Sequence, residues 1–312
     1  MAAAILLLAL GTLLVYPGAD LAVRGVSAIA RRTGLSAFVL GAVLFGIDIE
    51  GLGATLVAAG RGETQIAAGG AFGTIVFLFT AAFGAALVLA RRPVPAPPPI
   101  SLAAPSVGVW ACALAISDRF VSRTEGLLLL GLYVAYVVLL VRSRRDRDDA
   151  DPHGEAEDAP AAPDEGHLRW VLLTTCGLAL LSVGALALVV GGSRIAAASG
   201  LASGFVGAAI IGALTSLDEV LLEVLPVRRG QPDLALGNLL GTLMAFTTGV
   251  PGLAALVRPL SLDSGANLAF LAAAITYGIV ATVFFARKRA GRALGAVLLT
   301  LYVLWLLYAG SV

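Results

Sequence analysis

The sequence predicts an all-α integral membrane protein with ten transmembrane helices arranged as two inverted five-helix repeats. Of its 312 residues, 59% are hydrophobic and 13% are charged, a balance that no soluble domain can cover with polar surface. Apolar runs long enough to cross a hydrocarbon layer of ~30 Å as helices recur along the chain, which argues against a β-barrel. The two halves of the chain also resemble each other, and each half contains five of these runs.

The predicted spans follow one another at short intervals. The first is interpreted as a retained span because it has no positively charged start and continues past residue 20. The first repeat is expected to cover residues 1–142 and the second residues 169–312. The spans cover roughly residues 4–29, 35–59, 65–90, 99–117 and 124–142 in the first repeat, and 169–190, 200–226, 233–257, 266–286 and 291–309 in the second.

Residues 143–168 form the one long hydrophilic segment. Their Pro, Ala, Asp and Glu content without an apolar cluster predicts a disordered linker, either a plain tether or a segment that senses cations. The net charge of +1 gives no support to nucleic-acid binding. Both histidines, His153 and His167, lie in this segment, so we expect no haem or other cofactor within the membrane.

Arginine and lysine residues are divided unequally between the two sides of the predicted membrane. The ends and loops that follow odd-numbered spans hold 16 of them, whereas those that follow even-numbered spans hold 5. Cytoplasmic loops of membrane proteins carry the excess of positive charge. We therefore predict a multi-pass protein of the cell membrane, with both termini outside and the linker in the cytoplasm.

Two segments of the first half recur in the second half. GLSAFVLGAVL and RGETQIAAGGAFGT correspond to GLASGFVGAAI and RGQPDLALGNLLGT, at constant offsets of 166 and 168 residues. Because each repeat holds an odd number of spans, the second copy enters the bilayer from the opposite side. Inverted repeats are the architecture of secondary transporters, whose binding site lies near the midplane and whose helices are often broken there.

Three acidic residues interrupt the seventh span, in the stretch GALTSLDEVLLEVL. An ionisable residue at the centre of a span costs about 2.5 to 3.5 kcal/mol on insertion scales, so it needs compensation. Thr215, Glu219 and Glu223 are spaced by four and share one helical face, with Ser216 and Asp218 beside it. The alternative for Glu223 and Asp218 is a position at the cytoplasmic boundary, where nearby arginines or water neutralise them.

The first half supplies Asp48 and Glu50 in the second span. They are two residues apart and face different sides of a regular helix, unless the neighbouring glycines open the backbone. Thr74 and Thr242 occupy equivalent positions in the third and eighth spans, and each either faces the site or bonds back to its own helix. Carboxylates and hydroxyls gathered from two helices form the all-oxygen cage that hard cations such as Ca²⁺ and Na⁺ prefer.

The residues of the seventh and eighth spans resemble the second repeat of the cation/Ca²⁺ exchanger superfamily, as in a divergent prokaryotic-type sodium/calcium exchanger membrane region. The repeats of that family contain approximately G-T-S-L-P-E followed by G-N-x-x-G-S-N, and this chain has TSLDE at 215–219 and GNLLGT at 237–242. The resemblance covers nearly the whole chain except the linker. It implies a ten-helix antiporter in which Glu219 binds the cation at the midplane, helped by the hydroxyls of Thr215 and Ser216.

The chain departs from the family pattern at several positions. Asp218 replaces the motif proline, and the final asparagine of the second motif is lost. In the first copy Gly51 or Gly53 stands at the position of the motif glutamate, depending on the alignment. Glu50 is therefore expected to supply the missing acid, with Asp48 as the alternative. Fewer polar ligands predict fewer ion sites.

These observations predict a secondary active antiporter that exchanges Ca²⁺ for Na⁺ or H⁺ by alternating access at a carboxylate site. The expected partners are inorganic cations and the lipid bilayer. One alternative is an antiporter that exchanges Na⁺ or K⁺ for H⁺, and another is a non-transporting scaffold or sensor with a degenerate exchanger fold. No nucleophile and base accompany the acids, so an enzyme is not expected.

Overall fold

The predicted all-α class is confirmed by a computed structural model, which describes residues 2–148, 167–198 and 216–309. Within these ranges seven helical segments are long and apolar enough to cross a membrane, and two shorter apolar helices accompany them. The chain is therefore a multi-pass membrane protein. The count of ten spans stays a prediction, because the seventh predicted span lies partly outside the described residues.

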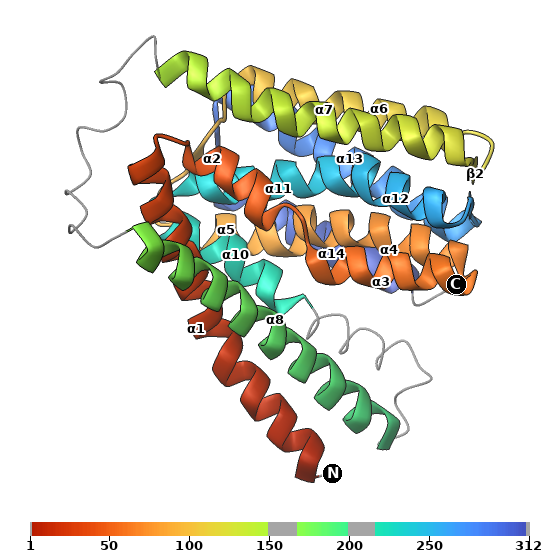
Figure 1. The fold of residues 1–312 in the computed structure, drawn as a ribbon, viewed down its shortest axis with the longest axis horizontal. Coiled ribbons are helices and arrows are strands. Elements are labelled where there is room, and N and C mark those ends of the chain that lie inside the picture. Colours follow the sequence, from red (N-terminus) through yellow and green to blue (C-terminus); the bar gives the residue numbers. More distant parts are fainter. Residues whose placement is uncertain (1, 149–166, 199–215, 310–312) are drawn as a thin grey trace.

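The first half begins with one long helix and continues with shorter ones (Figure 1). Two single π-helical turns, η1 (Gly41–Phe45) and η2 (Leu78–Ala82), interrupt the second and third predicted spans. The helices are α1 (Ala2–Thr33), α2 (Ala37–Leu40), α3 (Ile49–Arg61), α4 (Thr64–Phe77), α5 (Phe83–Leu89), α6 (Pro99–Ala115) and α7 (Arg123–Asp148).

The second half has a corresponding series of helices. A π-helical turn, η3 (Ala245–Gly249), interrupts the eighth predicted span, as η2 interrupts the third. The helices are α8 (His167–Ala198), α10 (Leu217–Arg228), α11 (Pro232–Met244), α12 (Val250–Val257), α13 (Ser264–Arg287) and α14 (Arg292–Ala309).

Residues at both ends of the predicted linker are helical in the structure. Helix α7 continues to Asp148 instead of ending near residue 142, so the first residues assigned to the linker are helical. Helix α8 begins at His167, close to the predicted start of the second repeat. Residues 149–166, the remaining part of the predicted linker, lie outside the described residues.

Two short antiparallel strand pairs join the two halves of the chain. The sequence did not predict these strands. Strand β1 (Val94–Pro95) pairs with β4 (Arg289–Ala290), and β2 (Phe120–Val121) pairs with β3 (Leu260–Ser261). Each pair links one strand from the first half to one from the second half. The loops of the two halves are thereby held together next to the helix ends.

Helices α1 and α8 form a tightly packed antiparallel pair that runs at an angle to the other helices (Figure 1). A Cβ atom added to Gly18 would lie 2.6 Å from the backbone nitrogen of Leu181, so only glycine fits there. Small residues at such contacts let helix backbones approach closely within a membrane. The contact glycines recur every seven residues, as Gly11, Gly18 and Gly25 in α1 and Gly177, Gly184 and Gly191 in α8.

Buried hydrophobic side chains form two clusters. The larger cluster unites helices α3 to α7 with α10 to α14. The smaller cluster joins the α1–α8 pair to α2, η1 and α10 through residues such as Val15, Phe45, Leu181 and Leu222. The junction between the α1–α8 pair and the remaining helices is therefore packed, and the acidic residues lie along it.

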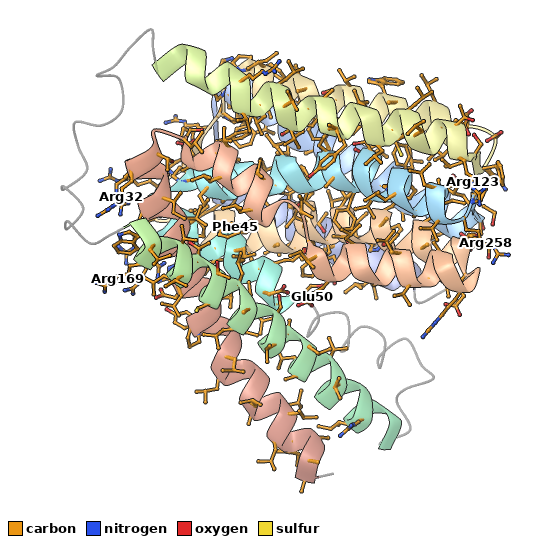
Figure 2. The ribbon with its side chains drawn as sticks, viewed as in Figure 1. Arg32, Phe45, Glu50, Arg123, Arg169 and Arg258 are labelled. Atoms are coloured by element: carbon orange, nitrogen blue, oxygen red, sulfur yellow. The ribbon has the colours of Figure 1, made fainter. Side chains whose placement is uncertain are left out.

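Arginines from alternate loops mark opposite ends of the molecule. Arg32 and Arg169, from loops predicted to be cytoplasmic, lie at one end in Figure 2, and Arg123 and Arg258, from loops predicted to be outside, lie at the other. Glu50 lies between these ends in the same view. The alternation agrees with successive crossings of a bilayer, and the side that faces the cytoplasm stays a prediction.

Candidate cation site

The second predicted span is interrupted, and the interruption positions Asp48. Residues 46–48 between η1 and α3 are not helical. Asp48 has extended backbone angles, and its Oδ1 accepts hydrogen bonds from the backbone N–H groups of Glu50 and Gly51, both at 2.9 Å. Aspartate is favoured at such an N-cap because its side chain satisfies N–H groups that have no helical partner. The break therefore places Asp48 at the start of α3 and Glu50 in its first turn.

Helix α10, from the second half of the chain, also carries two acids at its start. Its first turn carries Asp218 and Glu219, and Ser216 occupies the N-cap position without a side-chain capping bond. The N-terminus of a helix carries a partial positive charge that stabilises nearby carboxylates. Two helix starts, one from each half of the chain, thus hold two acids each.

These four acidic side chains line one cavity. Its volume is about 60 Å³, which leaves room for an ion with some water, since one water molecule needs on the order of 10 to 15 Å³. Helices α3, α8, α10 and α11 all contribute to its wall. The polar lining residues are Asp48, Glu50, Ser182, Asp218, Glu219, Asn238 and Thr242, and the apolar ones are Leu44, Phe45, Ile47, Ile49, Leu178, Leu181 and Leu222.

Acids from the two halves of the chain share the wall of this cavity. Asp48 is the first-half acid that caps α3, and Glu219 lies in the first turn of α10 from the second half. Glu50 of α3 and Ser182 of α8 also line the same wall. Asp218 Oδ1 and Glu219 Oε2 are buried without a hydrogen-bonding partner in the described part of the chain. These two oxygens are free to bind a cation.

The four carboxyl groups are not arranged as a complete metal cage. Among the described residues, no group of three or more His, Cys, Asp or Glu side chains is placed so that it could hold a metal ion. A cation at this site therefore requires further oxygens, from hydroxyls, carbonyls or water, or a change in side-chain positions. The hydroxyl of Thr242 and the amide of Asn238 lie on the same wall.

Glu223 lies one helical turn beyond Glu219, and its side chain is buried between helices. Its side chain is 0% exposed, and its Oε1 accepts a hydrogen bond of 3.0 Å from Nδ2 of Asn238, which is itself 3% exposed. Its Oε2 has no partner in the described ranges. The interpretation of Glu223 as a solvated residue beside the arginines is therefore wrong, because α11 covers it.

The structure brings together five of the eight predicted site residues, namely Asp48, Glu50, Asp218, Glu219 and Thr242. Ser216 and Thr74 are not among the lining residues, and the hydroxyl of Thr74 donates to the carbonyl of Gly70 at 3.2 Å. Thr215 lies outside the described residues. Threonine hydroxyls within a helix often donate to the backbone carbonyl of the preceding turn, as that of Thr74 does.

Sequence reasoning did not select Ser182 and Asn238 as site residues. The signal for Asn238 was present, because it belongs to the GNLLGT motif. Ser182 has a weaker signal, a single hydroxyl within the apolar stretch LALLSVGAL. Its role depends on the packing of α8 against the break in the second span, which local sequence does not specify.

The sequence matches the profile of the family described as Sodium/calcium exchanger protein over residues 3–142 and 169–310. The chain belongs to this family. The resemblance inferred from TSLDE and GNLLGT is thereby confirmed. Family membership supports a cation antiporter, a transporter rather than an enzyme.

Related proteins align with this chain over almost its whole length. It is 28% identical over 307 residues to the candidate antiporter CaxA of Alkalimonas amylolytica, with 94% of each chain covered. It is 26% identical over 315 residues to the inner membrane protein YrbG of Escherichia coli (strain K12), with 96% of this chain and 94% of that protein covered. A structure of the sodium-calcium exchanger NCX_Mj, soaked with 10 mM Na⁺ and 10 mM Sr²⁺, has a TM-score of 0.80 and 23% identity, with 97% of each chain covered. The last likeness shows a shared fold.

Gly51, one of the two candidate positions for the missing motif glutamate, has no room for a side chain. A Cβ atom added to Gly51 would overlap Oδ2 of Asp48 and lie 2.9 Å from Cζ of Phe246. The carboxyl group of Asp48 thus occupies the space that a side chain at Gly51 would need. At Gly53, the other candidate position, nothing lies within 4 Å of an added Cβ atom.

Proposed function

We propose that this protein is a secondary active antiporter that exchanges Ca²⁺ for Na⁺ or H⁺ across the cell membrane by alternating access. The general assignment, a cation antiporter, rests on its family. The observation that supports the finer proposal is the cavity in which acids from α3 and α10 meet. In this proposal the termini lie outside and the segment after α7 lies in the cytoplasm, as the arginine distribution predicts.

The donor set of the cavity suits a hard cation. Ca²⁺ is bound in proteins by six to eight oxygens from carboxylates, carbonyls and water, and the polar lining residues all carry oxygen. Buried carboxylates without compensation are costly inside a membrane. A bound Ca²⁺ supplies two positive charges to a cavity lined by four acids. We assign the main ligand role to Glu219 and Asp48, with Glu50, Asp218 and Thr242 as further ligands.

Competition for the same oxygens explains how the two ion fluxes would be coupled. A proton bound by one of these neighbouring acids neutralises it, whereas a metal ion between Asp48 and Glu219 requires both carboxylates to be ionised. The two groups cannot hold the proton and the metal ion at once. Binding of one ion therefore releases the other, and each crossing carries one kind of ion.

Movement of the α1–α8 pair would expose the cavity to either side. Three lining residues, Leu178, Leu181 and Ser182, belong to α8, whereas the acids belong to α3 and α10. The close glycine contacts make α1 and α8 a single unit. A shift of this unit against the other helices changes which side of the cavity is covered.

The test is an ion-flux panel in proteoliposomes that contain the purified full chain. Fluxes of Ca²⁺, Na⁺, K⁺ and Mg²⁺ are measured against imposed Na⁺ and proton gradients. We expect Ca²⁺ flux driven by at least one of these gradients, and its loss in the Glu219→Gln variant. The control is Glu63→Gln, which removes an exposed acid at the start of α4, outside the cavity.

Three outcomes of the panel have different meanings. Flux of Na⁺ or K⁺ against protons without Ca²⁺ flux would replace the proposed substrate with a monovalent cation. No cation-dependent flux from folded protein would favour a scaffold or sensor. Retained Ca²⁺ exchange in folded Glu219→Gln protein would refute the ligand assignment.

A further inference from the structure

A second and larger pocket lies away from the acidic cavity, where α5 ends and α10 turns into α11. Its volume is about 450 Å³, within the range of about 300 to 1,000 Å³ that is typical of ligand pockets. Four arginines line it: Arg91 and Arg92 follow α5, whereas Arg228 ends α10 and Arg229 follows it. The pocket therefore lies between the two halves of the chain, and each half contributes two arginines.

The positive charge of this pocket is not neutralised by its own wall. No acidic residue lines the pocket, and three of its four arginines make no ion pair within the described ranges. The exception is Arg229, which pairs with Asp20 of α1. Asp233, in the first turn of α11, is exposed and is not a lining residue. The N-terminus of α11 adds a partial positive charge at Pro232.

The chemistry of the pocket selects an anion with several oxygens. The guanidinium fork of arginine matches phosphate oxygens in pairs, so a cluster of arginines favours phosphate over a monatomic anion. The arginines follow the ends of predicted spans, at the level where lipid headgroups begin. Basic pockets between transmembrane helices at this level bind anionic headgroups. We infer that this pocket binds a phosphate group, carried either by an anionic lipid or by a soluble phosphate compound.

The inferred site is separate from the cation cavity but shares a helix with it. Arg228 is nine residues beyond Glu219 on α10, which corresponds to about 14 Å along a helix that rises 1.5 Å per residue. A phosphate held by Arg91 and Arg228 would connect the end of α5 to the end of α10. The inference concerns binding alone and does not depend on which cations are exchanged.

The experiment measures binding to the purified full chain in neutral detergent, with thermal unfolding as the readout. One arm titrates phosphatidylglycerol against phosphatidylcholine, and the other titrates inorganic pyrophosphate. We expect a saturable rise in Tm in at least one arm, and an apparent Kd at least tenfold weaker in the Arg91→Ala/Arg228→Ala variant. The control is Arg31→Ala/Arg142→Ala, which removes two exposed arginines predicted to lie on the same side and outside the pocket.

The two arms also identify the source of the phosphate. A response to phosphatidylglycerol alone assigns a lipid, and a response to pyrophosphate assigns a soluble compound. Equal losses in the pocket and control variants would refute the inference, as would the lack of a saturable response in either arm. If the alanine variant does not fold, Arg91→Gln/Arg228→Gln takes its place, and the salt dependence of wild-type binding supplies a further check, because ionic binding weakens as salt is added.

Discussion

The buried pair of Glu223 and Asn238 gives the sharpest test of the packing between α10 and α11. The amide of Asn238 is the donor to Glu223 Oε1 at 3.0 Å, and the other oxygen, Oε2, has no partner in the described ranges. The change Asn238→Leu removes this donor. Leaving a buried polar group unsatisfied costs about 1 to 3 kcal/mol, and more when the group is charged.

The double variant Asn238→Leu/Glu223→Leu should recover most of that loss. Replacing both partners of a buried hydrogen bond with apolar groups is nearly neutral, so we expect a coupling energy of about 1 to 3 kcal/mol between the two positions. Thermal unfolding in detergent measures it, because about 1 kcal/mol shifts Tm by roughly 2 to 4 °C in domains of 150–250 residues. If Asn238→Leu leaves Tm unchanged, or if the second substitution adds a further independent loss, the two side chains are not a buried pair.

Four further substitutions give testable outcomes, three at glycines and one at the hydroxyl of Ser182. Gly18→Ala should destabilise the protein by about 1 to 3 kcal/mol in thermal unfolding, because its new Cβ overlaps the α8 backbone. Gly53→Ala, where nothing lies within 4 Å of the new atom, should stabilise the protein by about 0.4 to 1 kcal/mol, and the opposite order would contradict the contact. Gly51→Ala should displace the Asp48 carboxyl group and weaken cation binding about tenfold in calorimetry, whereas unchanged affinity would exclude Asp48 as a ligand. Ser182→Ala should alter the KM for the transported cation by less than about tenfold, since a single hydroxyl in the cavity wall contributes about 0.5 to 1.5 kcal/mol through one hydrogen bond, and an inactive but folded variant would give Ser182 a larger role.

Most of the fold could be predicted from the sequence because a bilayer restricts the choices. Apolar segments of sufficient length must form helices there, since no water satisfies their backbone groups. Hydropathy therefore located helices such as α13 and α14 within a few residues of their ends. It did not locate the end of α7 at Asp148, because a charged helix can continue into water beyond the membrane.

The acidic residues of the site could be predicted because carboxylates are rare in an apolar membrane span. Asp48, Glu50, Asp218 and Glu219 were selected in this way, and all of them line the cavity. The partner of Glu223 could not be predicted, because it depends on the way that α11 crosses α10 in three dimensions. The spacing of acids along one helix indicates a shared face but does not indicate what covers that face.

The departure of the first half from the family motif changes the number of oxygens that the half can give to a cation. An acid within a helix can offer both carboxylate oxygens, whereas an acid at a cap must use one of them for the helix. Oδ1 of Asp48 already accepts from the N–H groups of Glu50 and Gly51, which leaves Oδ2 for a cation. The same cap helps the chain to retain the acid in the membrane, because the start of α3 offsets part of its charge. The cap thereby makes Asp48 easier to keep buried and leaves it one carboxylate oxygen for a cation.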